Sequence, residues 1–256
     1  MTLGPAFSVL RNRAAVAAEL RRLIPRMEGF RTKTLPFGLS AVDRCLPQGG
    51  LACALHEIVP DEGATPAAFG FIVALLARLS RAHSILLVLP AYGLRHYGRP
   101  HGHGLRAFGL DPGRLILVET AHRRETLWAM EEALRSGAPA AVAGVIDKLD
   151  LKLSQRLQLA ATDAGLPLFL LRPAEILESS AAATRWRVGT APAARDRFGL
   201  MTRSRWQLML ERCRNGRAGE WTVEYDHVAH RFSLAAALAD SAFAIGAGEK
   251  AFRRAG

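Results

Sequence analysis

The stretch that decides the fold is CALHEIVPDEGATPAAFGFIVALLARLS, residues 53–80. It begins with a strand-like run over 53–59, passes through the short loop PDEGAT at 60–65, and continues as an apolar helix over 67–80. A buried strand, a short loop and a helix in this order form the repeating unit of a parallel α/β sheet. The loop of such a unit is also the place where nucleotide-binding folds hold phosphate. The stretch therefore predicts the fold class and also a position at which nucleotide binding can be judged.

The alternation of strands and helices continues beyond this unit as far as residue 171. Further strands are predicted at 85–89, 115–118, 140–146 and 166–171, and further helices at 122–136 and 151–164. A Gly- and His-rich loop is expected between the strand at 85–89 and Gly104. Short apolar strands that alternate with helices are typical of a mainly parallel sheet covered by helices on both faces.

The chain changes character after Pro173. Four later segments alternate polar with apolar or aromatic residues: 184–188, 205–212, 220–226 and 230–234. They are predicted to be antiparallel strands added at one edge of the sheet. At the opposite end of the chain, the pattern over 6–28 predicts a basic amphipathic helix. The expected organisation is a basic helix and linker over 1–33, an α/β core over 34–239 and a tail over 240–256.

Composition narrows the class of protein. The 256 residues carry a formal net charge of +11, with 30 Arg against 4 Lys. Such a balance favours an anionic partner such as nucleic acid, although a GC-rich genome produces the same excess of Arg. Three cysteines without CxxC spacing indicate a reducing compartment without a disulfide framework or a zinc site. Neither a secretory signal nor an apolar run of membrane-spanning length is found, so we expect a cytoplasmic protein with no membrane partner.

The loop that follows the first strand lacks the residues that hold a nucleotide. A working phosphate loop needs a Gly-rich backbone, a Lys for the β- and γ-phosphates, and Ser or Thr for Mg²⁺. The degenerate loop here has one glycine, no lysine and two carboxylates, and it consists of Asp61, Glu62, Gly63, Ala64 and Thr65. We expect Thr65 to be the N-cap of the following helix, with Pro66 at its first position, and not a metal ligand. No cofactor and no metal are expected at this loop.

With these elements in order, most of the chain, about 34–234, resembles the RecA-like superfamily. The motif LPFGLSAVD…QGGL…LHEIVP is similar to the segment of recombinases that leads into the first core strand, and ALRSGAPAAVAGVI (133–146) resembles the passage into the Walker B strand. RCRNGRAGEW (212–221) resembles the basic KNRxG hairpin of RadA-like and helicase-like RecA folds. The resemblance implies an α/β RecA-like core, with a hairpin that carries basic residues toward DNA or a neighbouring subunit.

The catalytic positions that this resemblance implies are not filled. RecA-type ATPases place a water-activating Glu just after the second core strand, where this chain has Pro90, Ala91 and Tyr92. The metal-binding Asp should end the strand at 140–146, which contains none; Asp147 lies just beyond it and is otherwise an ordinary loop or capping acid. We therefore expect no catalytic residue and no ATP hydrolysis.

The whole chain, including LRP…TRWRV and the Trp- and Arg-rich strands near its end, looks like the ImuA family. The resemblance implies a non-enzymatic role in damage-induced SOS mutagenesis, at the nucleoid. Its implied partners are ImuB, an inactive Y-family polymerase homologue, and an error-prone replicative-type DNA polymerase. RecA and single-stranded DNA are further candidate partners. Two alternatives remain: a SulA-like cell-division inhibitor, and a RecA-like ATPase with an unusual nucleotide loop.

The predicted C-terminal strands carry the candidate nucleic-acid or partner site. Its residues are Arg203, Arg205, Arg212, Arg214, Asn215 and Arg217. Arg guanidinium groups suit phosphate oxygens, and an exposed Trp can stack on an unpaired base. Because side chains alternate along a strand, Arg185 and Arg187 should share one face while Trp186 points to the other. The alternative is therefore that the tryptophans belong to the core and the arginines to a solvated edge.

Two further segments are candidate sites. The basic N-terminal helix, with Arg11, Arg13, Arg21 and Arg22, either docks on a partner or packs on its own core. The histidines at 96, 101 and 103 have a spacing that zinc could use, but no acid or cysteine completes the set nearby. We expect them to be part of a surface loop.

Overall fold

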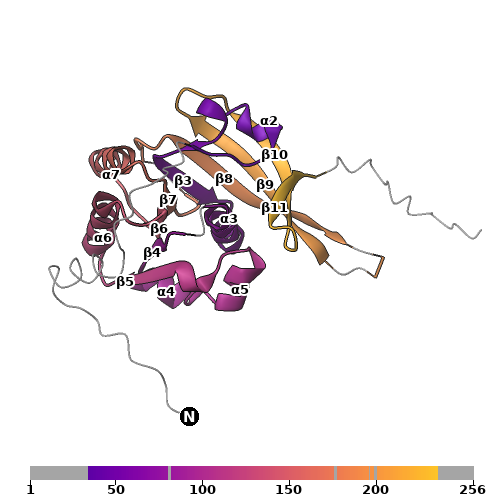
Figure 1. Cartoon of the computed structure of the whole chain (residues 1–256), viewed down its shortest axis with the longest axis horizontal. Helices are drawn as coiled ribbons and strands as arrows, with labels where there is room; N and C mark the ends of the chain where they lie inside the picture. The colour runs from indigo at the N-terminus through magenta and orange to yellow at the C-terminus, as the bar shows by residue number, and fades with distance from the viewer. Residues whose placement is uncertain (1–33, 80–81, 176–177, 196, 199–200, 236–256) are drawn as a thin grey trace, which may run out of the picture.

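The computed structural model describes residues 34–79, 82–175, 178–195, 197–198 and 201–235, and its centre is a nine-stranded sheet (Figure 1). In spatial order the strands are β11-β10-β9-β8-β3-β7-β6-β4-β5. A separate two-stranded sheet pairs β1 (Thr34–Leu35) with β2 (Leu51–Ala52). The predicted N-terminal helix and the tail from 240 lie outside the described residues.

The elements follow one another along the chain in the predicted alternation. The strands of the large sheet are β3 (Leu55–Pro60), β4 (Ile85–Pro90), β5 (Leu115–Thr120), β6 (Ala141–Val145), β7 (Leu168–Leu171), β8 (Thr184–Arg195), β9 (Met201–Cys213), β10 (Gly219–Asp226) and β11 (Arg231–Leu234). The helices are α2 (Ser40–Asp43), α3 (Thr65–Ala77), α4 (Ala91–Tyr97), α5 (Gly102–Ala107), α6 (Arg123–Ser136) and α7 (Leu151–Ala164), with short 3-10 turns η1 (Pro47–Gly49) and η2 (Pro112–Arg114).

The sheet is mainly parallel, as predicted. Strands β3, β7, β6, β4 and β5 pair in parallel, and every residue of β3, β4 and β7 is buried. Strands covered on both faces have no polar side, which is why they appear as continuous apolar runs in the sequence. Strands β9, β10 and β11 add to the sheet in antiparallel order. The prediction of an α/β sheet with antiparallel strands at its C-terminal edge is confirmed.

The prediction for the first of these edge strands was wrong in direction. The segment at 184–188 is the start of β8, which pairs in parallel with β3, Ile58 lying opposite Trp186. On its other side β8 pairs antiparallel with β9. Alternation of polar and apolar residues reports which face a side chain occupies, and it carries no information about strand direction. Strand β8 is thus the junction between the parallel and the antiparallel halves of the sheet.

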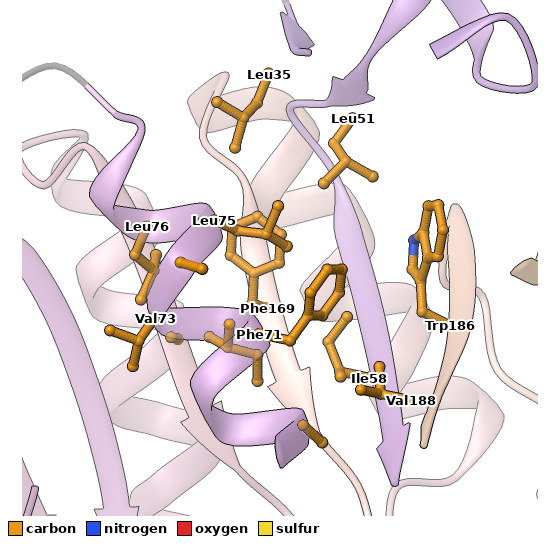
Figure 2. Packing of buried hydrophobic residues seen from close by; sticks show 14 of the residues in the cluster. Leu35, Leu51, Ile58, Phe71, Val73, Leu75, Leu76, Phe169, Trp186 and Val188 are labelled. Carbon is orange, nitrogen blue, oxygen red and sulfur yellow. The ribbon is translucent and has the colours of Figure 1, made fainter. Parts of the chain in front are cut away.

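Helices cover the two faces of the sheet separately. Helix α3 lies on one face, where Phe71 and Leu75 pack with Ile58 of β3 and Trp186 of β8 (Figure 2). The segment 34–52 covers the same face, and the ring of its Phe37 lies 5.1 Å from that of Trp186. Helices α6 and α7 pack on the opposite face in a second apolar cluster. Within the described residues, no helix is long and apolar enough to cross a membrane.

The predicted loop between 90 and 104 was also wrong, because it contains the two short helices α4 and α5. Each spans fewer than two full turns, which is too short for a helical period to be recognised among the glycines and prolines. By contrast, helix α7 has the predicted bounds. Its N-cap Asp150 accepts a hydrogen bond from Leu153 N at 2.8 Å, and Gly165 ends it with a φ of +62°. That left-handed conformation favours glycine.

The buried His56 of β3 makes stability depend on pH. Its Nδ1 lies 2.8 Å from Thr184 Oγ1 and its Nε2 lies 2.8 Å from Ala52 O. Burial disfavours the charged imidazole and lowers the pKa of His56 from 6.5 to about 4, although the hydrogen bond to Ala52 opposes the shift. The His56 imidazole of the unfolded chain is therefore protonated below about pH 6.5, whereas that of the folded chain stays neutral until the pH approaches 4. The resulting stability is present above pH 6.5 and is lost as the pH falls toward 4.

We predict that lowering the pH from 7 to 5 removes about 2 kcal/mol of unfolding free energy through His56 alone. Urea unfolding at the two pH values measures the change. The variant His56→Gln should be less stable at pH 7 but should lose less on acidification, by that amount. The exposed His122 provides the matched control, His122→Gln, which should keep the wild-type pH dependence. Equal slopes in His56→Gln and wild type would contradict the assignment.

Candidate nucleotide and nucleic-acid sites

The loop between β3 and α3 is short and bonded within the protein. Only four residues, Asp61 to Ala64, separate the end of the strand from the start of the helix. The amide of Asp61 donates to Val188 O and that of Ala64 donates to Asp61 O, both at 2.9 Å. Gly63, with a φ of +72°, completes this tight turn. Two of the amides that a phosphate loop would present to its ligand are therefore already used inside the protein.

The helix begins one residue earlier than predicted. Ala64 is its N-cap and makes no side-chain capping bond, so the prediction that Thr65 caps the helix was wrong. Thr65 is instead the first helical residue and Pro66 the second, where proline is tolerated because the first turn needs no amide donors. A Thr-Pro pair locates the start of a helix to within about one or two residues.

The carboxylate of Asp61 fastens the loop to the neighbouring strands. Its Oδ1 lies 4.0 Å from Nη1 of Arg187 on β8, and Arg187 in turn donates to Glu211 on β9. Its Oδ2 lies over Gly189, where an added Cβ would be only 2.2 Å away. Glu62 is exposed beside it. The loop thus presents negative charge where a triphosphate would need positive charge.

A phenol and a carboxylate follow the ends of β4 and β6. Tyr92 follows β4, and burial, with the nearby Asp147 carboxylate as a second cause, raises its pKa to about 12. The phenol is therefore protonated at neutral pH and cannot act as a base. Asp147 is exposed beyond β6, and its Oδ1 accepts a hydrogen bond from Lys148 N at 2.7 Å. That contact is typical of an ordinary loop acid.

A buried ionic network lies behind the loop, and sequence analysis did not find it. Glu57 of β3 is fully buried, and its Oε2 accepts from Ser180 Oγ at 2.8 Å and from Arg185 Nε at 2.9 Å. Arg172, directly after β7, places its Nε 3.5 Å from Glu57 Oε1 and donates to Glu178 at 2.8 Å. Burial lowers the pKa of Arg172, and the two Glu carboxylates oppose that shift. The only signal in the sequence is a single Glu inside an apolar strand.

The predicted basic site is divided between the two ends of β9. Near its start, Arg205 Nε and Arg203 Nη1 donate to the carboxylate of Glu224 at 2.8 and 3.1 Å. Burial raises the pKa of Glu224, but these hydrogen bonds outweigh it and the pKa is lowered. From residue 203 to residue 212 a strand extends for about 30 Å. Arg203 and Arg205 therefore cannot share one compact site with the residues at the other end.

At the other end of β9, the remaining residues surround the turn into β10. Arg212 Nη2 donates to Ser180 O and Ala182 O at 2.6 and 3.0 Å, and Arg214 Nη2 donates to Ala181 O at 3.1 Å. Asn215 occupies the turn with a φ of +60°. Arg214, Asn215 and Arg217 are exposed, whereas Arg212 is half-buried. The turn at 214–217 is the part of the candidate site that solvent reaches most freely.

The tryptophans belong largely to the core. Trp186 and Trp206 are buried, and the half-buried Trp221 packs on Trp186 with 6.1 Å between ring centroids. Arg185 and Arg187 lie on the face opposite Trp186, as predicted, where they meet Glu57 and Glu211. The interpretation of Trp186 and Trp206 as core residues is confirmed.

Two other candidate sites remain without structural support. His101 and His103 stack with 5.1 Å between ring centroids, and no group of three metal-ligating side chains occurs among the described residues. The side chain of His96 lies outside them. Arg11, Arg13, Arg21 and Arg22 of the predicted partner helix also lie outside the described part of the chain.

Comparison with known proteins assigns the family. No family model matches the chain. Protein ImuA of Caulobacter vibrioides strain NA1000 / CB15N is 35% identical over 235 residues, which cover 83% of this chain and 93% of that protein. Protein ImuA of strain ATCC 19089 / CIP 103742 / CB 15 matches to the same extent. The chain belongs to the ImuA family. The match spans nearly the whole length of these two relatives and most of this ImuA-family chain.

We predict that Gly189→Ala destabilises the protein by about 1 kcal/mol, because the new methyl group displaces the half-exposed Asp61 carboxylate from its place beside Arg187. In an Asp61→Ala background the same substitution should cost far less. Urea unfolding of the four proteins measures this coupling. Gly104→Ala is the control, because its methyl group would meet no atom within 4 Å. Equal costs of Gly189→Ala in both backgrounds would show that the carboxylate does not lie there.

Proposed function

We propose that this chain is a non-catalytic, RecA-like accessory factor of damage-induced translesion DNA synthesis. The observation that carries the proposal is the loop after β3. It has four residues, no lysine, two carboxylates, and amides that bond to Val188 and Asp61 within the protein. A nucleotide-hydrolysing site would need the opposite arrangement, with free amides and a cation directed toward the phosphates. We therefore infer that the protein acts by binding other molecules at its surface.

Membership of the ImuA family supports a role in the ImuA–ImuB system of damage-induced mutagenesis. Within that system we propose that the chain binds an ImuB-like, inactive Y-family polymerase. RecA and an error-prone replicative-type DNA polymerase are further proposed partners. The mainly parallel sheet and the short loop between the first core strand and α3 support the proposal of a RecA-like core that does not bind nucleotide.

We further propose that the exposed turn at 214–217 contacts single-stranded DNA or the polymerase-like partner. Arg214 and Arg217 extend from the end of the β9–β10 hairpin, and one guanidinium nitrogen of Arg214 is anchored on Ala181 O. An anchored guanidinium loses less conformational freedom on binding a phosphate oxygen than a free one. Arg203 and Arg205 are excluded from this proposal because Glu224 already pairs with both.

Nucleotide binding provides the first test. We expect a fluorescent ATP analogue with Mg²⁺ to show no saturable binding in the micromolar range, and ATP turnover to stay at the level of a protein-free blank. A P-loop ATPase measured in parallel confirms that the assay works. Micromolar affinity together with turnover would identify the chain as an ATPase with an unusual loop and would sink the proposal.

Charge reversal at the turn provides the second test. We expect Arg214→Glu with Arg217→Glu to weaken retention on single-stranded DNA, and to reduce the slope of log affinity against log salt by about 1.4. Arg123→Glu with Arg124→Glu on α6 makes the same change in net charge on two exposed residues and should have a much smaller effect. Partner co-purification should be measured on the same variants. Unchanged DNA retention and unchanged co-purification would exclude the turn from both roles.

A further inference from the structure

A cavity of about 370 Å³ lies between α3 and the helices α4 and α5, at the carboxyl ends of β4, β6 and β7. Its walls are largely apolar, with Phe69 and Val73 from α3, Leu89 from β4, Leu105 and Phe108 from the α5 region, and Leu171 from β7. The volume falls within the range of protein ligand pockets. Thr65 at the start of α3 is the one residue of the degenerate loop in its wall, and the basic turn at 214–217 contributes none.

The walls of the cavity are held in place by the surrounding core. Gly70 allows Phe108 to approach α3, since a Cβ at Gly70 would lie 3.0 Å from the ring. Phe108 packs on Trp206 with 6.0 Å between ring centroids, and its carbonyl accepts a hydrogen bond from Tyr225 Oη at 2.8 Å. The apolar surface is therefore preformed, and a ligand need not order it.

The segment that closes the cavity is positively charged. Residues 91–109, which form α4, α5 and the connection between them, contain Arg95, Arg99 and Arg106 and no Asp or Glu. Arg99 lies in the cavity wall with its side chain 67% exposed, and its Nη2 donates to Glu119 Oε2 of β5 at 2.9 Å. Tyr97 lies at the mouth and is 61% exposed. Glu119 neutralises Arg99, so the positive charge beside the apolar cavity comes from the exposed Arg95 on α4 and Arg106 on α5.

This combination matches an acidic peptide better than the other ligands that the chain could meet. A nucleotide needs cations or amides directed at its phosphates, and among the described residues of the wall the cationic side chain is Arg99, which already pairs with Glu119. The chain's own residues 1–33 carry a net formal charge of +5, with seven Arg and Lys against two Glu, and the cationic border would repel them. An acidic partner segment is attracted by the positive charge and can bury an apolar side chain in the cavity.

We propose that this cavity receives a large apolar side chain from an acidic segment of a partner protein. The proposal deepens the partner-binding function proposed above and rests on it. The anchor side chain fills the space between Phe69, Leu105 and Leu171, while the carboxylates beside it face the cationic surface of 91–109. Burial of one large apolar side chain changes affinity by roughly ten- to a hundredfold.

The test fills the cavity from within the chain. Gly104 lies in the wall, its φ is not in the left-handed region, and an added Cβ would meet no atom within 4 Å. We expect Gly104→Trp in the full chain to weaken binding at least tenfold, and Gly104→Ala to bind like wild type. Thermal unfolding of each variant verifies the fold. Tyr97→Glu is the second variant, which adds a carboxylate at the exposed mouth and should also weaken binding.

Two probes separate this proposal from the proposed function. The first is a short fluorescein-labelled peptide of Asp and Glu with one central Phe, compared with the same peptide carrying Ser; the second is the co-expressed ImuB-like protein. The Phe peptide should bind more tightly than the Ser peptide, and only in chains with an open cavity. Its affinity should also fall with salt.

The outcomes are distinct. Loss of Phe-peptide binding in Gly104→Trp together with capture of the ImuB-like protein by wild type supports both proposals. If the wild type binds the Phe peptide but does not capture the ImuB-like protein, the cavity is supported as a docking site and the ImuB-like protein is excluded as its partner. If the Phe and Ser peptides bind equally, or if Gly104→Trp binds both probes like wild type, the cavity is not a docking site. Displacement of the Phe peptide by ATP or by a single-stranded oligonucleotide at equimolar concentration would assign the cavity to that ligand instead.

Discussion

One buried carboxylate contacts both halves of the sheet. Glu57 lies on the central strand β3, and it contacts Arg172 after β7 on one side and Arg185 of β8 on the other. A buried carboxylate is tolerated only when charged and hydrogen-bonding groups surround it; Ser180 donates to Oε2, whereas Oε1 has the Arg172 guanidinium at 3.5 Å and no hydrogen bond among the described residues. Because β8 continues into the antiparallel strands, this contact lies at the junction from which the C-terminal extension begins, beside the backbone pairing of β3 with β8.

The next arginine on this face of β8 holds the loop between β3 and α3 in place. Arg187 follows Arg185 on the same face of β8, and it contacts Asp61 of the loop and Glu211 of β9. A loop that is bonded to β8 in this way is a structural connection and is not available as a flexible cradle for a ligand. The surfaces that we propose as functional lie elsewhere, on the β9–β10 turn and around the cavity beside α3.

Much of the fold could be predicted because its signals are local. The bounds of α7 follow from Asp150 and Gly165, and the buried strands follow from their apolar runs. The direction of β8, the helices α4 and α5 and the network around Glu57 depend on contacts across more than a hundred residues or on segments too short to show a period. The division of the basic residues could have been recognised, because the rise per residue already separates Arg203 from Arg212 by about 30 Å.

The place of β3 in the sheet also determines the order in which the protein can fold during synthesis. Strand β3 is made before the other strands of the large sheet, yet its two neighbours, β7 and β8, are made after β4, β5 and β6. Glu57 and Arg185 are 128 residues apart in the chain. Until the ribosome has produced β8, the central strand lacks one neighbour and its buried carboxylate lacks Arg185. Folding of the core around β3 is therefore completed only after β8, in the last third of the chain, has been made, as is typical of sheets with distant pairings.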